Sequence, residues 1–178
     1  MQKCLGALFF SFLNYDKIGL LSDTHSYLDE SVFKYFADCD EIWHAGDFGE
    51  ANVADQLEAF KPLRGVYGNI DGRDLRLRFP EDLRFTCEEV EGFMTHIGGY
   101  PGKYAARIKA ELIANPPKLF ITGHSHILKV VFDPKISCLH LNPGAAGKHG
   151  WHKVRTLMRF EINKDKIDNL EVIELKER

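Results

Sequence analysis

The sequence lacks the cysteine patterns of zinc-binding and disulfide-rich proteins. Four cysteines are scattered through 178 residues, with no CxxC pair and no zinc-ribbon spacing. This distribution argues against a cysteine-based structural metal site and against a disulfide framework. Isolated cysteines in apolar stretches are typical of buried, reduced thiols, so we expect a cytoplasmic protein. The cysteines are Cys4, Cys39, Cys87 and Cys138.

Basic runs and long apolar runs are also missing. The formal net charge is −3 and lysines and arginines form no cluster, which argues against strong nucleic-acid binding through the phosphate backbone. The apolar stretch CLGALFFSFL, residues 4–13, is too short to span a bilayer as a helix, and no good signal-cleavage site precedes Asp16. We therefore expect no membrane association. Residues 1–16 are interpreted as an N-terminal extension, with a secretion signal as the alternative.

The first half of the chain alternates short apolar runs with amphipathic segments. Apolar runs at 18–22, 41–44 and 63–67 have the length and composition of buried strands. Between them, 29–37 and 51–60 carry apolar residues at helical spacing. This βαβαβ order predicts parallel strands joined by right-handed crossovers.

The second half is richer in strands. A hairpin is expected with its turn at Glu91-Gly92, and residues 104–114 have a helical pattern that ends before two prolines. About ten strands and three or four helices are too many for one flat sheet. The prediction is an α/β fold in one domain, residues 17–178, with two mixed sheets packed face to face and flanked by helices. The remaining expected strands are 118–122, 127–132, 136–141, 154–162 and 167–175, the last two joined by a turn at 163–166.

Five of the apolar runs end abruptly in residues that bind metals. Ligand sites in α/β sheets form at the carboxyl ends of strands, so these donors are expected at one edge of one sheet. Asp23 and His25 are two residues apart, as are His124 and His126, a spacing that points strand side chains the same way. Glycines before three of the donors would let the backbone turn sharply. The seven donors are Asp23, His25, Asp47, Asn69, His96, His124 and His126.

The donor types indicate a two-metal hydrolytic site. Two divalent ions about 3.5–4 Å apart can hold the attacking and leaving oxygens of a phosphoryl displacement. An anion must lie between them, and Asp47 is the natural bridge. Carboxylates with imidazoles suit transition metals better than magnesium, so we expect two divalent ions, manganese first, with iron, zinc or nickel as alternatives. A structural zinc site is disfavoured because no thiolate is offered.

The ordered set of motifs resembles the calcineurin-like metallophosphoesterase superfamily, and in particular its small YfcE-type phosphodiesterase branch. The family pattern D-x-H, G-D, G-N, H and G-H-x-H matches residues between about 17 and 147. The resemblance implies a ββ sandwich flanked by helices. It also implies that Asp47 bridges the two metals. One metal would be bound by Asp23, His25 and His126, and the other by Asn69, His96 and His124.

One position departs from the family pattern. Many members carry a histidine directly after the asparagine, where it is the usual candidate for protonating the leaving group. Here that residue is Ile70, which cannot donate a proton. The small branch commonly lacks this histidine as well.

Charge balance narrows the expected reaction. Two divalent ions, less the carboxylates of Asp23 and Asp47, leave two positive charges, which a hydroxide and a phosphodiester would neutralise. We therefore predict hydrolysis of a small or nucleotide-like phosphodiester by a metal-bound hydroxide, with Asp47, Asn69 and His96 taking part in catalysis. The alternative is a protein-interaction scaffold of the retromer-subunit type with a vestigial metal site. A nuclease acting on long polymers ranks last because no basic channel is evident.

For several other polar residues, two alternative roles are consistent with the sequence. His44 and His140 lie in apolar strands, as core histidines or as supports for metal ligands. Asn142 is either a turn residue or a contact of the metal ligands. The segment 98–104 would be a loop over the site or an exposed connection. Asp71 and Arg73 are expected to form a local salt bridge, and the surface is expected to hold Lys148, His149 and His152.

Overall fold

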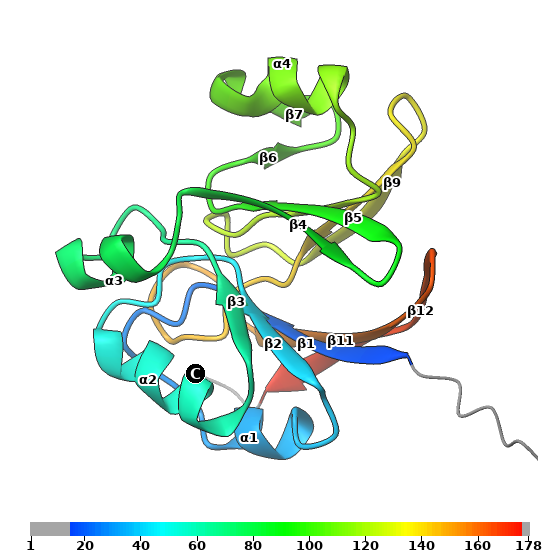
Figure 1. Cartoon of the computed structure of the whole chain (residues 1–178). Coiled ribbons are helices and arrows are strands. Elements are labelled where there is room, and N and C mark those ends of the chain that lie inside the picture. Colours follow the sequence, from blue (N-terminus) through cyan, green and yellow to red (C-terminus); the bar gives the residue numbers. More distant parts are fainter. Residues whose placement is uncertain (1–14, 176–178) are drawn as a thin grey trace, which may run out of the picture.

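Two five-stranded sheets form the centre of the structure, a computed structural model that describes residues 15–175 (Figure 1). The first sheet has the order β12-β11-β1-β2-β3. Its β1–β2 and β2–β3 pairs are parallel, as the βαβαβ pattern predicts, and β11 adds to β1 in the antiparallel direction. The elements of this half are β1 (Asp16–Leu21), α1 (Ser31–Tyr35), β2 (Glu41–His44), α2 (Ala51–Phe60), β3 (Leu63–Gly65), β11 (Arg155–Asn163) and β12 (Lys166–Leu175).

The second sheet is also mixed. Its order is β4-β5-β8-β10-β9, with parallel β5–β8 and β8–β10 pairs and antiparallel pairs at both edges. A short helix and a two-stranded ribbon join the larger elements. The elements of this half are α3 (Arg73–Arg78), β4 (Asp82–Cys87), β5 (Val90–Thr95), β6 (Gly99–Tyr100), β7 (Lys103–Tyr104), α4 (Ala106–Ala114), β8 (Leu119–Ile121), β9 (Lys129–Asp133) and β10 (Cys138–Asn142).

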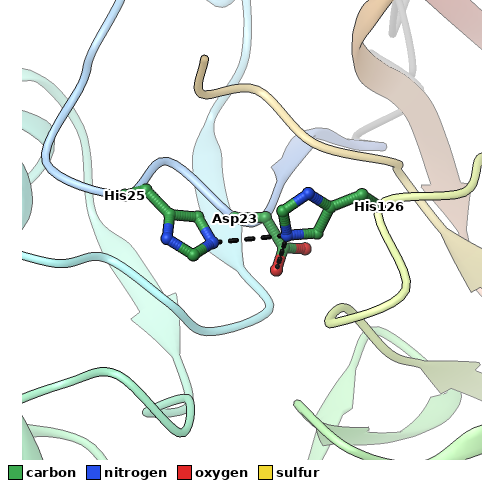
Figure 2. Close-up of side chains that lie close together, drawn as sticks. All are labelled: Asp23, His25 and His126. Atoms are coloured by element: carbon green, nitrogen blue, oxygen red, sulfur yellow. Dashed lines mark hydrogen bonds and ion pairs between the residues drawn. The ribbon is translucent and has the colours of Figure 1, made fainter. Parts of the chain in front are cut away.

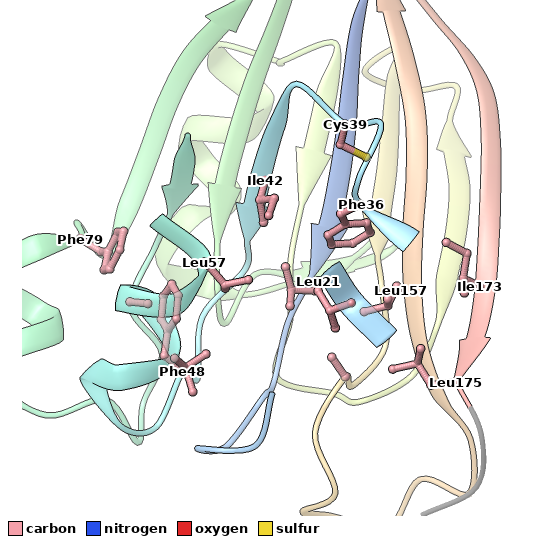
Figure 3. Close-up of a cluster of buried hydrophobic side chains, with 14 of the residues drawn as sticks. Leu21, Phe36, Cys39, Ile42, Phe48, Leu57, Phe79, Leu157, Ile173 and Leu175 are labelled. Carbon is pink, nitrogen blue, oxygen red and sulfur yellow. The ribbon is translucent and has the colours of Figure 1, made fainter. Parts of the chain in front are cut away.

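The structure has four layers: helices α1 and α2, the first sheet, the second sheet, and helix α4. Three apolar clusters lie between them. Between the sheets, side chains such as Leu20 and Trp43 pack with Leu141 of the opposite sheet. On the outer face of the first sheet, α1 and α2 cover a second cluster that includes Phe36 and Leu57 (Figure 3). The third cluster includes Ile108 and Leu112 of α4, the helix that covers the outer face of the second sheet (Figure 1). Because burying a large apolar side chain contributes about 1.5–3 kcal/mol, these clusters fix how the two sheets face each other. The predicted sandwich flanked by helices is therefore confirmed.

The hairpin of the second sheet turns at a different place from the one expected. Cys87 pairs with Val90, so the turn is Glu88-Glu89, and the predicted turn at Glu91-Gly92 is wrong. Gly92 is a strand residue for a packing reason, because a Cβ there would lie 2.5 Å from the Phe85 ring. Glu88 takes the left-handed conformation that the turn needs, with φ of 50°.

Other boundaries differ by a few residues. The helix expected from residue 29 begins at Ser31, because the Asp29 carboxylate accepts the Ser31 backbone N–H at 3.0 Å and caps it from outside. Helix α3 and the β6–β7 ribbon were not predicted from the sequence. The C-terminal hairpin turns where expected, with Asn163 paired to Lys166. The interpretation of residues 1–16 as an extension falls almost wholly outside the described residues.

Candidate metal centre

The predicted donors lie in loops that follow strands of both sheets. Asp23, Asp47 and Asn69 follow β1, β2 and β3 of the first sheet, whereas His96 and His124 follow β5 and β8 of the second. The expectation that all the donors lie at one edge of one sheet is therefore wrong. The parallel β5–β8 pair brings the ends of those two strands together, and face-to-face packing sets them against the first sheet.

One group of donors combines a buried carboxylate with two imidazoles. Candidate ligand atoms of Asp23, His25 and His126 all lie within 4.8 Å of one another (Figure 2). The Nε2 atom of His126 is 3.2 Å from Asp23 Oδ1 and 3.3 Å from His25 Nε2. Two imidazoles and a carboxylate that converge in this way can hold a divalent transition metal.

A second group of donors lies next to the first, and the Asp47 carboxylate is close to histidines of both groups. Asp47, His96 and His124 also bring candidate ligand atoms within 4.8 Å of one another. Asp47 Oδ2 lies 3.2 Å from His96 Nε2 and 3.5 Å from His25 Nε2, so this carboxylate reaches both groups. Asn69 is exposed and lines the same cavity as Asp47 and His124.

The surroundings of His96 create a need for a positive charge. Its Nδ1 lies 2.8 Å from the Ala45 carbonyl oxygen, which requires a proton on Nδ1 and leaves a lone pair on Nε2 in the neutral ring. That buried Nε2 has no hydrogen-bond partner and lies 3.2 Å from Asp47 and 3.9 Å from Asp23. A lone pair beside two carboxylates is satisfied by a proton or a cation. Burial alone would lower the pKa of His96, but Asp47 and Asp23 outweigh it and raise the pKa. The donor set therefore fits a divalent metal.

The same interactions act on the other titratable donors. Burial would raise the pKa of Asp47, but contact with His96 outweighs burial and the pKa is lowered. Burial lowers the pKa of His25 and of His124. Neutral imidazoles and ionised carboxylates are the protonation states in which these groups bind metals.

The donor loops have an unusual backbone. Asp23, His25, Asp47, His124 and His126 have φ between 46° and 65°, the left-handed region that residues other than glycine rarely adopt. The prediction that the paired donors point the same way as alternate residues of a strand is therefore wrong, because these residues are not extended. Backbone hydrogen bonds between loops hold the geometry, such as Asp23 N–H to Gly46 O at 3.0 Å and His25 N–H to Asp47 O at 3.1 Å. Strain of this kind is concentrated at functional sites.

All three glycines that precede donors are needed for space: a Cβ on Gly46 would lie 2.6 Å from the His96 ring. A Cβ on Gly68 would lie 2.0 Å from Asp47 Oδ1, and one on Gly123 would lie 2.2 Å from the Ser22 hydroxyl. Only Gly46 of the three has a left-handed φ, 94°. The expectation that glycine provides sharp turns therefore holds for Gly46, and all three glycines permit close packing of the loops.

Buried polar side chains support the donor loops from behind. Asp71 does not pair with Arg73. Its carboxylate accepts the backbone N–H groups of Gly49 and Gly68, at 2.8 and 2.7 Å. Asn142 donates to the Gly123 carbonyl at 2.8 Å, next to His124.

The two histidines in strands also belong to this framework. His44 contacts Thr24 Oγ1 at 3.0 Å between the first two donors, and burial lowers its pKa well below the usual value. His140 contacts Thr122 Oγ1 at 3.0 Å, and Thr122 also receives a hydrogen bond from Asn142. Both histidines are therefore buried, hydrogen-bonded supports of the donor loops.

Two histidines after β10 contact the donors, although the sequence did not indicate it. His149 was expected only at the surface; it is exposed, yet its ring stacks on His25 with centroids 4.8 Å apart. His152 is half-buried, with its Nδ1 3.3 Å from Nδ1 of His126. The expectation that His152 is a surface residue is wrong. No motif spacing marks these residues; they follow β10, whose parallel pairing with β8 directs the chain to the edge of the sheet where His124 lies.

The fold and site together define an α/β-sandwich protein with a candidate two-metal centre built from aspartate, histidine and asparagine. The family model "Calcineurin-like phosphoesterase superfamily domain" matches residues 17–165. The chain belongs to this superfamily.

Proteins of similar sequence are described as phosphoesterases, in agreement with the family. The chain is 31% identical over 114 residues to a probable metallophosphoesterase of Methanothermobacter thermautotrophicus, covering 61% of this chain and 66% of that relative, slightly less than two thirds of its length. It is 27% identical over 144 residues to the phosphodiesterase MJ0936 of Methanocaldococcus jannaschii, covering 72% of this chain and 82% of the relative.

Solved structures share the fold at low sequence identity. A structure described as a novel archaeal phosphodiesterase has a TM-score of 0.71 and 22% identity, covering 89% of this chain and 99% of that one. Zinc-bound Vps29 from Entamoeba histolytica has a TM-score of 0.67 and 17% identity, covering 89% and 98%. At these identities the likeness shows the fold alone. Among the described residues, no helix is both long and apolar enough to cross a membrane.

Proposed function

We propose that this protein is a metal-dependent phosphodiesterase with a dinuclear centre. The observation that carries the proposal is the position of Asp47, whose carboxylate lies 3.2 Å from a histidine of one donor group and 3.5 Å from a histidine of the other. Membership of the calcineurin-like phosphoesterase superfamily and the names of the relatives support the same activity.

Each donor has a role in this proposal. Asp23, His25 and His126 would hold one divalent ion, and His96, His124 and Asn69 the other, with Asp47 shared. Two ions bound there would supply an activated water and neutralise charge on the phosphoryl group. Asp71 and the left-handed loops keep the donors in position, so that little rearrangement is needed when the ions bind.

The residues present favour diesters over monoesters. The carboxylates of Asp23 and Asp47 leave the doubly loaded site with a small positive excess, which suits a singly charged phosphodiester better than a dianionic monoester. The residue after Asn69 is Ile70, whose side chain cannot protonate a leaving group, while its backbone N–H donates to Asp47 Oδ1 at 3.1 Å. We therefore expect faster turnover of diesters with good leaving groups, manganese being the first metal to test.

The experiment is metal analysis of the purified protein, together with manganese-dependent hydrolysis of bis-p-nitrophenyl phosphate and p-nitrophenyl phosphate. Wild type is expected to bind about two ions and to hydrolyse the diester faster. Asp47→Asn is expected to lose metal and to lower the diester rate by about 100-fold or more. A mutant that keeps both metal and rate would contradict the proposal, and a faster monoester would contradict the charge argument.

A scaffold role is the second candidate, and one observation favours it. The edge strand β9 exposes Val130, Val131 and Phe132, the last with 58% of its surface accessible. Unpaired apolar edges are potential contact surfaces for other chains. The same experiment separates the two functions, because a scaffold with a vestigial site would bind metal weakly and hydrolyse neither ester.

A further inference from the structure

The cavity above the candidate metal centre has an apolar outer wall. It has a volume of about 560 Å³, and its inner wall includes Asp47 and His126. Its rim carries Ile70, Ile127 and Trp151, whose exposed fractions are 45%, 61% and 101%. A fully exposed tryptophan is uncommon in a folded protein. Here it lies in the cavity that contains the donors, so a ligand held by its phosphate at the donors can reach the indole.

The segment that carries Trp151 is fastened to the first donor group on both sides. The backbone N–H of Gly147 donates to the Asp23 carbonyl at 3.0 Å. Gly150 has φ of 116° and packs so closely that a Cβ there would lie 2.3 Å from the His126 ring. His152 contacts His126 and the Gly147 carbonyl, at 3.3 and 3.0 Å. Trp151 therefore projects from a backbone whose position is set by the metal donors themselves.

The charge of the cavity wall limits what the rest of the ligand can be. No lysine or arginine is among the described residues that line it. A second phosphate or a long polyanion would gain no ion pair from this wall. Besides the donors and the rings of His149 and His152, the wall offers the aliphatic side chains of Ile70 and Ile127 and the indole face of Trp151, which suit a flat, uncharged ring.

We propose that Trp151 is the stacking platform for the nucleobase of a nucleoside phosphodiester substrate. The inference rests on the proposed phosphodiesterase function and deepens it by naming the substrate class. The phosphate is held at the donors, and the nucleoside extends along the apolar rim so that its base lies on the indole. Base–aromatic stacking tolerates any base, so the site selects nucleosides without strong preference among them.

The kinetic test compares two diesters with the same leaving group, thymidine 5′-(p-nitrophenyl phosphate) and methyl p-nitrophenyl phosphate. For Trp151→Ala, kcat/KM for the thymidine ester should fall by about 5- to 150-fold, the range of one base–aromatic stack, mainly through KM. The methyl ester should change less than twofold. Trp151→Phe should keep most of the activity on the nucleotide. Phe132→Ala is the matched control, since it removes an exposed aromatic ring on β9, outside the cavity.

A binding test does not depend on turnover. The chain has two tryptophans, and Trp43 is fully buried, so quenching by a stacked base reports Trp151. Adenosine 5′-monophosphate should quench the fluorescence of zinc-loaded protein, whereas methyl phosphate at the same concentration should not. In Trp151→Phe, which retains Trp43 alone, the quenching should disappear.

The outcomes separate this inference from the function on which it rests. If Trp151→Ala lowers both diesters equally, or lowers neither, and no quenching occurs, the stacking role is wrong while the phosphodiesterase function stands. If wild type hydrolyses neither diester with any metal, the proposed function fails, and the quenching experiment still decides whether Trp151 binds a base.

Discussion

The rings of His126 and His152 meet edge to face, with their Nδ1 atoms 3.3 Å apart. His152 Nε2 lies 3.0 Å from the Gly147 carbonyl oxygen, so the proton of neutral His152 is on Nε2 and its Nδ1 accepts. His126 must then donate from Nδ1, which leaves its Nε2 lone pair directed at Asp23. Partners of this kind fix the tautomer and orientation of a metal ligand.

Replacing His152 should therefore weaken metal binding. We expect His152→Phe to lower zinc affinity by about 10- to 100-fold, because His126 loses the acceptor that fixes its tautomer. Isothermal titration calorimetry of the metal-stripped protein measures the change. His149→Phe is the matched control, since it keeps a ring against His25 and should alter the affinity much less. Equal losses in both variants would remove the tautomer argument.

Bound metal should stabilise the fold. An ion that binds only the folded chain adds about 2.7 kcal/mol when present at 100 times its Kd, which corresponds to a rise in Tm of about 5–10 °C for a chain of this size. Calorimetry of chelator-treated protein with and without added metal checks this. Asp47→Asn should lose most of the increment, whereas Asp165→Asn, which alters an exposed carboxylate paired with Lys118, should keep it.

Adding one methyl group at Gly68 should disable the site. A Cβ at this position would lie 2.0 Å from Asp47 Oδ1, so Gly68→Ala must displace the shared carboxylate. We expect diester hydrolysis to fall by about 100-fold or more and the stabilisation by metal to decrease. Gly72→Ala, four residues later, meets no atom within 4 Å and should leave both unchanged. Full activity in Gly68→Ala would show that the loops can separate without loss.

The pH dependence of stability should include a contribution from His140. Burial, followed by the nearby Lys129, lowers the pKa of His140 to about 4. Between about pH 6.5 and pH 4 the unfolded chain therefore binds a proton that the folded protein does not, so the free energy of unfolding decreases as the pH falls. The full contribution is about 3 kcal/mol over this range.

Urea unfolding at a series of pH values tests this contribution. The slope with pH should be smaller in His140→Gln than in wild type, whatever the mutation does to stability at neutral pH. His149→Gln removes an exposed histidine and should keep the wild-type slope. Parallel curves for wild type and His140→Gln would contradict the lowered pKa.

Local patterns of apolar residues predicted many of the helices and strands. Residues 41–44 and 51–60 form β2 and α2 with the predicted bounds, because a short apolar run and a helical apolar face are signals contained in the segment itself. Helix α3 was missed because its residues RDLRLR carry too few apolar positions to show a helical period; Arg76 fixes it instead, with a hydrogen bond to the Asp71 carbonyl at 2.7 Å. The turn at Glu91-Gly92 was misplaced because Gly92 serves packing against Phe85, a contact across the strands.

The sequence by itself determined which donors exist and that each follows an apolar strand, since ligand chemistry and strand signals are local. Only the tertiary structure decided that the donors come from two sheets and that five donors have left-handed backbones, and it gave the distances at which Asp47, the bridge expected from the sequence, reaches both groups. It also brought the segment from Gly147 to His152 against His126. The physical reason is that these relationships depend on how distant strands pack face to face, and no spacing along the chain encodes that packing.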